Sequence, residues 1–87
     1  MASVKKMAAI IINKKMVKDY GALKTALENN DITLAKENLA LLEEAFNHLK
    51  SVGNLPNRES ADVVDFGEIF AECEQIFNTA TQDLISK

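Results

Sequence analysis

The sequence predicts an all-α protein, a three-helix bundle formed by one domain over residues 1–87. Two observations predict this class. Three stretches carry apolar residues at helical spacing, and together they cover most of the chain. Residues that break helices are rare, since the chain has one proline, Pro56, and three glycines. The length is sufficient for one modest hydrophobic core.

The most regular stretch predicts a helix over about residues 62–85. Its apolar or small residues alternate at steps of three and four, as in a heptad seam. The seam comprises Val63, Phe66, Phe70, Cys73, Phe77, Ala80 and Leu84. Ile69 and Ile76 widen it into the broad apolar face of a helix in a bundle. We expect Ser60 or Asp62 to cap this helix, and its acidic residues to face solvent.

A second helix is expected over about residues 32–52, started by Asp31 or Thr33 as N-cap. The residues of its core face also follow one another at steps of four and three. They are Ala35, Leu39, Leu42, Phe46 and Leu49. Gly53 follows the last apolar residue, so we expect it to end the helix as a C′ glycine. Residues 53–62 then form a polar loop that is longer than an ordinary connection between helices.

The first helix is expected over about residues 4–28, with Ser3 as its N-cap. Its core face comprises Ala9, Ile12, Met16, Tyr20, Leu23 and Leu27. Val4, Met7 and Ile11 lie on the opposite side, so the start of this helix is apolar nearly all round. Either the third helix folds over this side, or the side binds another chain. We favour the second alternative, in which a second copy completes the bundle.

The charges divide unevenly along the chain. Residues 1–28 carry six lysines and two acidic residues, whereas residues 29–87 carry four basic and eleven acidic residues. This division is typical of a basic arm for nucleic acid or lipid, or of two oppositely charged helices lying side by side. We favour neighbouring helices. Lys14, Lys15 and Lys18 cluster on one side of the first helix and are expected to meet the acidic third helix of a neighbouring molecule.

No arrangement of residues predicts catalysis. Glu44 lies four residues before His48, so the Glu-x-x-His spacing of carboxylate-bridged metal bundles is missing. The chain has no glycine-rich phosphate loop, and one histidine with one cysteine cannot build a zinc finger. We therefore expect no enzyme, no catalytic residue, no metal ligand, no cofactor and no small-molecule substrate.

Cellular location is predicted from the cysteine and the N-terminal segment. Cys73 lies within the apolar seam, which predicts a buried and unreactive thiol. The apolar run at residues 7–12 is too short for a signal peptide core or a membrane span. We expect an intracellular, cytoplasmic protein without a membrane partner. Nucleic acid is disfavoured, because the pI is near 5.0 and Arg58, the single arginine, lies in the loop.

The order and character of the helices resemble a known family. A basic segment at residues 13–18 leads into Leu-Lys-Thr-Ala-Leu at 23–27 and Leu-Ala-Leu-Leu-Glu-Glu-Ala-Phe at 39–46. A polar loop follows, and then an acidic helix with Phe66, Phe70 and Phe77. Over about residues 13–85, this pattern resembles the helical Gag-like region near the start of Pao-type retrotransposon polyproteins. The resemblance implies a non-enzymatic structural protein that self-assembles.

The sequence thus predicts a helical protein–protein interaction and self-assembly module that forms a homo-oligomer, in the first place a dimer. Its contact residues are expected to be Val4, Met7, Ile11, Lys14, Lys15 and Lys18. Two other functions stay open. One is a small phage- or plasmid-type regulatory or inhibitory protein that binds a larger protein as a monomer. The other is a DNA-associated helper, whose binding to duplex DNA would depend on salt.

Overall fold

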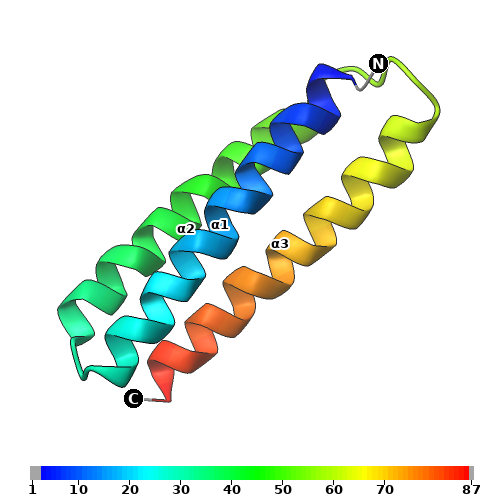
Figure 1. The fold of residues 1–87 in the computed structure, drawn as a ribbon. Helices are drawn as coiled ribbons and strands as arrows, with labels where there is room; N and C mark the ends of the chain where they lie inside the picture. Colours follow the sequence, from blue (N-terminus) through cyan, green and yellow to red (C-terminus); the bar gives the residue numbers. More distant parts are fainter. Residues whose placement is uncertain (1–2, 87) are drawn as a thin grey trace.

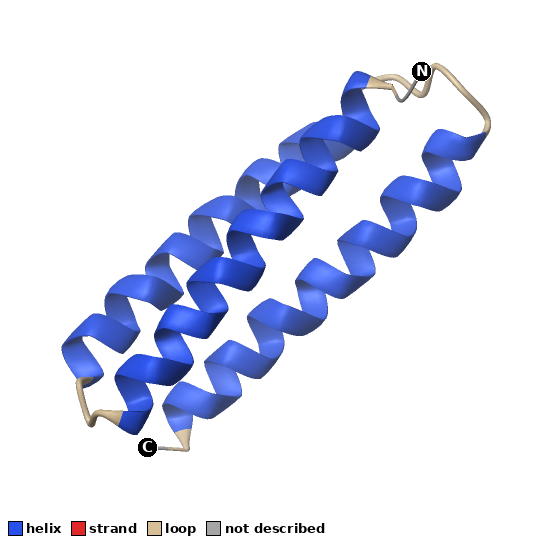
Figure 2. Ribbon diagram, in the orientation of Figure 1, coloured by secondary structure: helices blue, strands red, loops and turns tan. Residues whose placement is uncertain are grey.

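Three long helices lie side by side in the computed structural model, which describes residues 3–86 (Figure 1). The helices are α1 (Val4–Glu28), α2 (Ile32–Gly53) and α3 (Ala61–Ile85). Their connections lie at opposite ends of the bundle, so α1 and α3 run in the same direction and α2 runs against them (Figure 2). The predicted all-α three-helix bundle is confirmed, and each helix begins and ends within one residue of its expected bounds.

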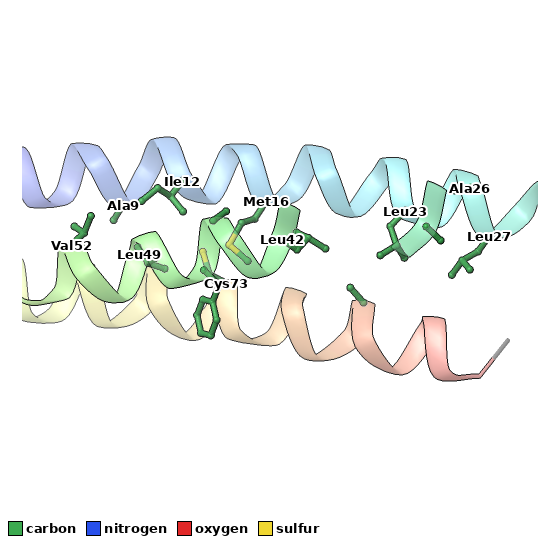
Figure 3. Packing of buried hydrophobic residues seen from close by; sticks show 14 residues of the cluster. Ala9, Ile12, Met16, Leu23, Ala26, Leu27, Leu42, Leu49, Val52 and Cys73 are labelled. Atoms are coloured by element: carbon green, nitrogen blue, oxygen red, sulfur yellow. The ribbon is translucent and has the colours of Figure 1, made fainter. Parts of the chain in front are cut away.

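The core lies along the middle of the bundle, where each helix turns one face inward (Figure 3). Its buried apolar residues are Ala9, Ile12, Met16, Leu23, Ala26, Leu27, Ala35, Leu42, Ala45, Phe46, Leu49, Val52, Cys73 and Ala80. The expected inward faces of α1 and α2 are confirmed, with Tyr20 and Leu39 half-buried at their edges. Burial of these faces is the main stabilising contribution in such a fold.

Four phenylalanines join α2 to α3. Phe46 of α2 is buried, and its ring centroid lies 5.2 Å from that of Phe70 and 5.7 Å from that of Phe77. The centroids of Phe66 and Phe70 are 5.9 Å apart. The Phe46–Phe77 pair is stacked and the other two pairs are tilted, and all three separations fall in the range in which aromatic pairs attract one another beyond their burial. Phe46 is therefore the centre of the contact between α2 and α3.

The turn between α1 and α2 is a Schellman motif. Asn30 adopts the left-handed conformation (φ 58°), and its N–H donates to the carbonyl of Leu27 at 3.1 Å. The N–H of Asp31 donates to the carbonyl of Ala26 at 2.8 Å, which completes the motif. The Asp31 carboxylate then accepts the N–H of Leu34 at 3.1 Å and caps α2. One short turn thus satisfies backbone groups of both helices.

The end of α2 differs from the expectation. Gly53 is the last helical residue, no glycine of the chain has a positive φ, and the C-cap is Asn54. The expected role of Gly53 as a C′ glycine is therefore wrong. A Cβ at Gly53 would lie 3.0 Å from Cζ of Phe66. The missing side chain allows Phe66 to pack against the end of α2, and the loop is shortened to residues 54–60.

The start of α3 also differs from the expectation. Val63 is 61% exposed, so the buried seam begins at Phe66 and not at Val63. The reason is that Asp62 turns inward, and the next residue on a helix points about 100° away. Ser60 occupies the N-cap position without a side-chain hydrogen bond, and Asp62 has a different role, described below.

Candidate interaction surface

The six predicted contact residues lie together on the side of α1 that faces away from the core. We call this set the outer face of α1, and it comprises Val4, Met7, Ile11, Lys14, Lys15 and Lys18. Val4 is 71% exposed, Met7 53% and Ile11 65%. The third helix therefore does not fold over this side. The inward residues of α1 fix this orientation, because the helical repeat places the two sets on opposite sides.

The outer face of α1 has an apolar half near the helix start and a basic half beyond it. In the basic half, Lys15 forms an ion pair with Asp19 at 2.8 Å within the helix. Lys14 and Lys18 are exposed and form no ion pair with any residue in the range 3–86. These two lysines are four residues apart, a spacing at which like charges repel on a helix. Their positive charge is available to a partner.

Lys5 lies beneath the apolar half and fixes the end of the bundle, a role that the sequence analysis missed. The residue is only 7% exposed. Its Nζ donates to Oδ1 of Asn57 at 2.6 Å and to the carbonyls of Leu55 at 3.2 Å and Gly53 at 3.3 Å. The same ammonium lies 4.9 Å from the ring centroid of Phe66. A cation at the C-terminus of α2 also complements the helix dipole.

Asp62 joins the starts of α1 and α3. Its carboxylate is almost fully buried and accepts hydrogen bonds from Ser3 Oγ at 2.6 Å and from the N–H groups of Arg58 at 2.8 Å and Glu59 at 3.2 Å. Ser3 Oγ accepts the N–H of Lys6 at 3.1 Å, which confirms Ser3 as the N-cap of α1. The expected solvent exposure of Asp62 is wrong.

These hydrogen bonds lower the pKa of the Asp62 carboxyl. The bond from Ser3 contributes most and the bond from the Arg58 N–H comes next, whereas burial acts in the opposite direction. The donors stabilise the ionised form, which is why the carboxylate can lie inside the protein. A hollow of about 150 Å³ lies beside this cluster, and its lining includes Val4 and Leu55.

The basic helix α1 and the acidic helix α3 lie side by side, as we predicted from the uneven division of charge along the chain. Lys6 of α1 and Asp65 of α3 form an ion pair at 3.1 Å. Towards the other end, the Tyr20 hydroxyl donates to Oδ2 of Asp83 at 2.9 Å. Burial raises the pKa of Tyr20, and the hydrogen bond to Asp83 raises it further. The two contacts hold α1 against α3 near both ends of the bundle.

Cys73 is fully buried at the centre of the bundle, as predicted. Its Sγ accepts a hydrogen bond from Nδ2 of Asn13 at 3.4 Å. Burial raises the pKa of the thiol, and the hydrogen bond from Asn13 opposes the rise. A thiol with this environment is a poor nucleophile.

Metal binding and membrane insertion place different demands on residues 3–86. Within this part of the chain, no three His, Cys, Asp or Glu side chains are grouped so that they could hold a metal ion. His48 is exposed on α2. None of the described helices combines the length and the apolar character that crossing a membrane requires.

Comparisons of the chain with protein-family models, with curated proteins and with solved structures found no match. The class of protein is therefore defined by its fold and by its exposed surface. The protein is a small all-α bundle whose first helix is amphipathic toward the core and carries a second, exposed apolar stripe at its start.

Proposed function

We propose that the protein is a non-enzymatic self-assembly module that binds a second copy of itself through the outer face of α1. The observation that carries this proposal is the exposure of Val4, Met7 and Ile11, three large apolar side chains in succession on one side of one helix. Single exposed apolar residues are ordinary on protein surfaces. A stripe of them is the kind of surface that a partner covers.

Charge complementarity supports a second copy as the partner. The outer face of α1 is basic beyond its apolar half, and α3 presents the exposed residues Glu68, Glu72 and Glu74. Two copies can therefore bring a basic and an acidic surface together, which steers association and fixes its register. A two-fold dimer is the simplest closed assembly. The resemblance to the Gag-like region implies the same activity, and we include that structural role in the proposal.

The size of the apolar half indicates a dimer that dissociates on dilution. A large apolar side chain that goes from fully exposed to fully buried contributes about 1.5–3 kcal/mol, and these three contribute a part of that because they are 53–71% exposed in one copy. In a two-fold dimer both copies supply them, against an association cost of roughly 4–15 kcal/mol. The two quantities are similar, so we expect association to depend on protein concentration over an accessible range.

A comparison of two variants tests the proposal. Ile11→Glu places a charge in the apolar half of the outer face, and Leu34→Glu places one at a 43% exposed position on α2 as the matched control. We expect Ile11→Glu to weaken self-association with unchanged helicity by circular dichroism, and Leu34→Glu to associate like the wild type. Equal association of Ile11→Glu and the wild type would contradict the proposal.

A further inference from the structure

We infer that the second copy binds along the line where α1 and α3 meet, in a parallel two-fold dimer in which Lys14 of each copy lies beside Glu72 of the other. This inference rests on the proposed function and specifies its partner surface. We call the surface the α1–α3 seam and define it by Ile10 and Val17 on α1 and by Ile69 and Ile76 on α3.

The register between α1 and α3 is the first step. Three hydrogen bonds connect α1, with its N-cap Ser3, to α3. They join residues 59, 60 and 63 positions apart, namely Ser3–Asp62, Asn13–Cys73 and Tyr20–Asp83. A residue of α1 is therefore level with the residue about 60 positions later on α3. By this rule Ile10 is level with Ile69, and Val17 is level with Ile76.

The α1–α3 seam is incompletely covered within one copy. Val17 is 50% exposed, and Ile10, Ile69 and Ile76 are half-buried. A hollow of about 300 Å³ lies on this side of the bundle and is lined by Tyr20, Glu72, Gln75, Ile76 and Thr79. Apolar side chains in these positions can bury more surface only against another molecule.

Charged residues of opposite sign flank the seam. Lys14 and Lys18 follow Ile10 on α1, and Glu68 and Glu72 stand next to Ile69 on α3. All four side chains are exposed, and none forms an ion pair with any residue in the range 3–86. Each pair consists of like charges four residues apart, which destabilises a lone helix. If the lysine pair of one copy lies against the glutamate pair of the other copy, each charge gains an opposite neighbour and both repulsions decrease.

A two-fold axis parallel to the helices meets these conditions. It sets α1 of each copy against α3 of the other, running in the same direction. Because the helices are in register, Ile10 then faces Ile69, Val17 faces Ile76, and Lys14 lies within one turn of Glu72 of the partner. An axis perpendicular to the helices would instead set α1 against α1 and bring lysines onto lysines, which is unfavourable.

Met7 and Lys14 border this arrangement, whereas Val4 and Lys15 lie on the flank of α1 toward α2 and its loop, where they line hollows with Leu55 and Leu41. Met7 lies one turn before Ile10 and Ile11, and Val64 of α3 is 60% exposed near the same end of the bundle. In the parallel dimer, the apolar start of α1 meets the apolar start of the partner's α3. Met7 thus connects the α1–α3 seam with the apolar half of the outer face of α1.

Charge reversal tests the inference. The variants are Lys14→Glu/Lys18→Glu and Glu68→Lys/Glu72→Lys, with Glu37→Lys/Glu43→Lys on α2 as the control; association is measured by sedimentation equilibrium at low salt. We expect each of the first two to raise the dimer Kd by about tenfold or more, since several charge pairs are reversed at once. Their equimolar mixture should form a heterodimer at least as tight as the wild type, and the control should dimerise normally.

Two outcomes overturn the inference in different ways. A wild-type dimer that both charge reversals leave unchanged, while Ile11→Glu breaks it, refutes the α1–α3 seam but not self-assembly. A strictly monomeric wild type refutes both the seam and the proposed function.

A distance measurement tests the parallel order separately. Glu28 is exposed at the end of α1, and Cys73 is buried, so spin labels on a Glu28→Cys variant report one position per copy. The parallel dimer requires a distance between labels well below the 45 Å long axis of the molecule. A distance comparable with that axis would show an antiparallel dimer and overturn the inference.

Discussion

Ser3 and Asp62 are 59 residues apart in the sequence and share a 2.6 Å hydrogen bond at the end of the bundle where α1 and α3 begin. The bond joins the N-cap of α1 to a carboxylate that also organises the loop before α3. Together with Lys5, it holds the start of α1 in place. The apolar half of the outer face is therefore presented on a fixed helix and not on a frayed end.

The lowered pKa of Asp62 makes stability depend on pH in the acid range. The ionised carboxyl group is more stable in the folded state than in the unfolded state. Its contribution to the free energy of unfolding is therefore fully present above the ordinary pKa of about 3.9. It is lost as pH falls through the lowered pKa of the folded state. We expect Asp62→Asn to be less stable than the wild type at neutral pH, and the difference to shrink in acid. Urea unfolding between about pH 7 and pH 2 measures this, and a difference that stays constant would contradict it.

The adjacent lysines Lys5 and Lys6 should differ sharply in their effect on stability. Lys5→Met leaves three acceptors without their buried donor and should lower the free energy of unfolding by about 1–3 kcal/mol. Lys6→Met removes one partly exposed ion pair to Asp65 and should cost about 0–1 kcal/mol. Denaturant titration compares them. Equal losses would mean that the Lys5 contacts contribute nothing specific.

The three glycines provide an internal comparison. Alanine at Gly21 or Gly67 meets no atom within 4 Å, so each change should stabilise its helix by roughly 0.5–1 kcal/mol. Alanine at Gly53 would crowd the ring of Phe66, which packs against Phe70. We expect Gly53→Ala to be less stable than the other two variants. Thermal unfolding of all three gives the order, and a Gly53→Ala variant as stable as the others would show that Phe66 moves freely.

Phe46 should be the most costly aromatic residue to remove. It is buried and contacts both Phe70 and Phe77, so Phe46→Ala should lower stability by about 3–5 kcal/mol. Phe66 is half-buried and near the end of the bundle, so Phe66→Ala should cost less. Chemical denaturation measures both, and the reverse order would contradict Phe46 as the centre of the α2–α3 contact.

The repeating features of the fold could be predicted from the sequence. Helical periodicity identified the three helices and the inward faces of α1 and α2, because burial follows the 3.6-residue repeat. The same repeat placed Val4, Met7 and Ile11 on the far side of α1. Their position opposite the core face is a property of one helix, whereas their exposure also requires that the third helix does not cover them, which the structure shows.

The end of the bundle could not be predicted in this way. Lys5 and Asp62 carry charge, and a charged residue is normally exposed. Lys5 is buried against the carbonyls of Gly53 and Leu55, and Asp62 accepts the hydroxyl of Ser3, so each depends on a partner about 50 or more residues away. No local sequence pattern predicts these contacts between distant residues. The exposure of Val63 follows from them, because the inward turn of Asp62 sets the orientation of the next residue.

The molar mass of the wild-type protein, measured by sedimentation equilibrium across a hundredfold range of concentration, tests the central claim of self-assembly most directly. We expect a reversible shift from monomer to dimer as concentration rises, and a loss of this shift in Ile11→Glu at unchanged helicity. A monomer at every concentration would contradict self-assembly. The outer face of α1 would then be the surface for a foreign protein partner, as in a small regulatory or inhibitory protein.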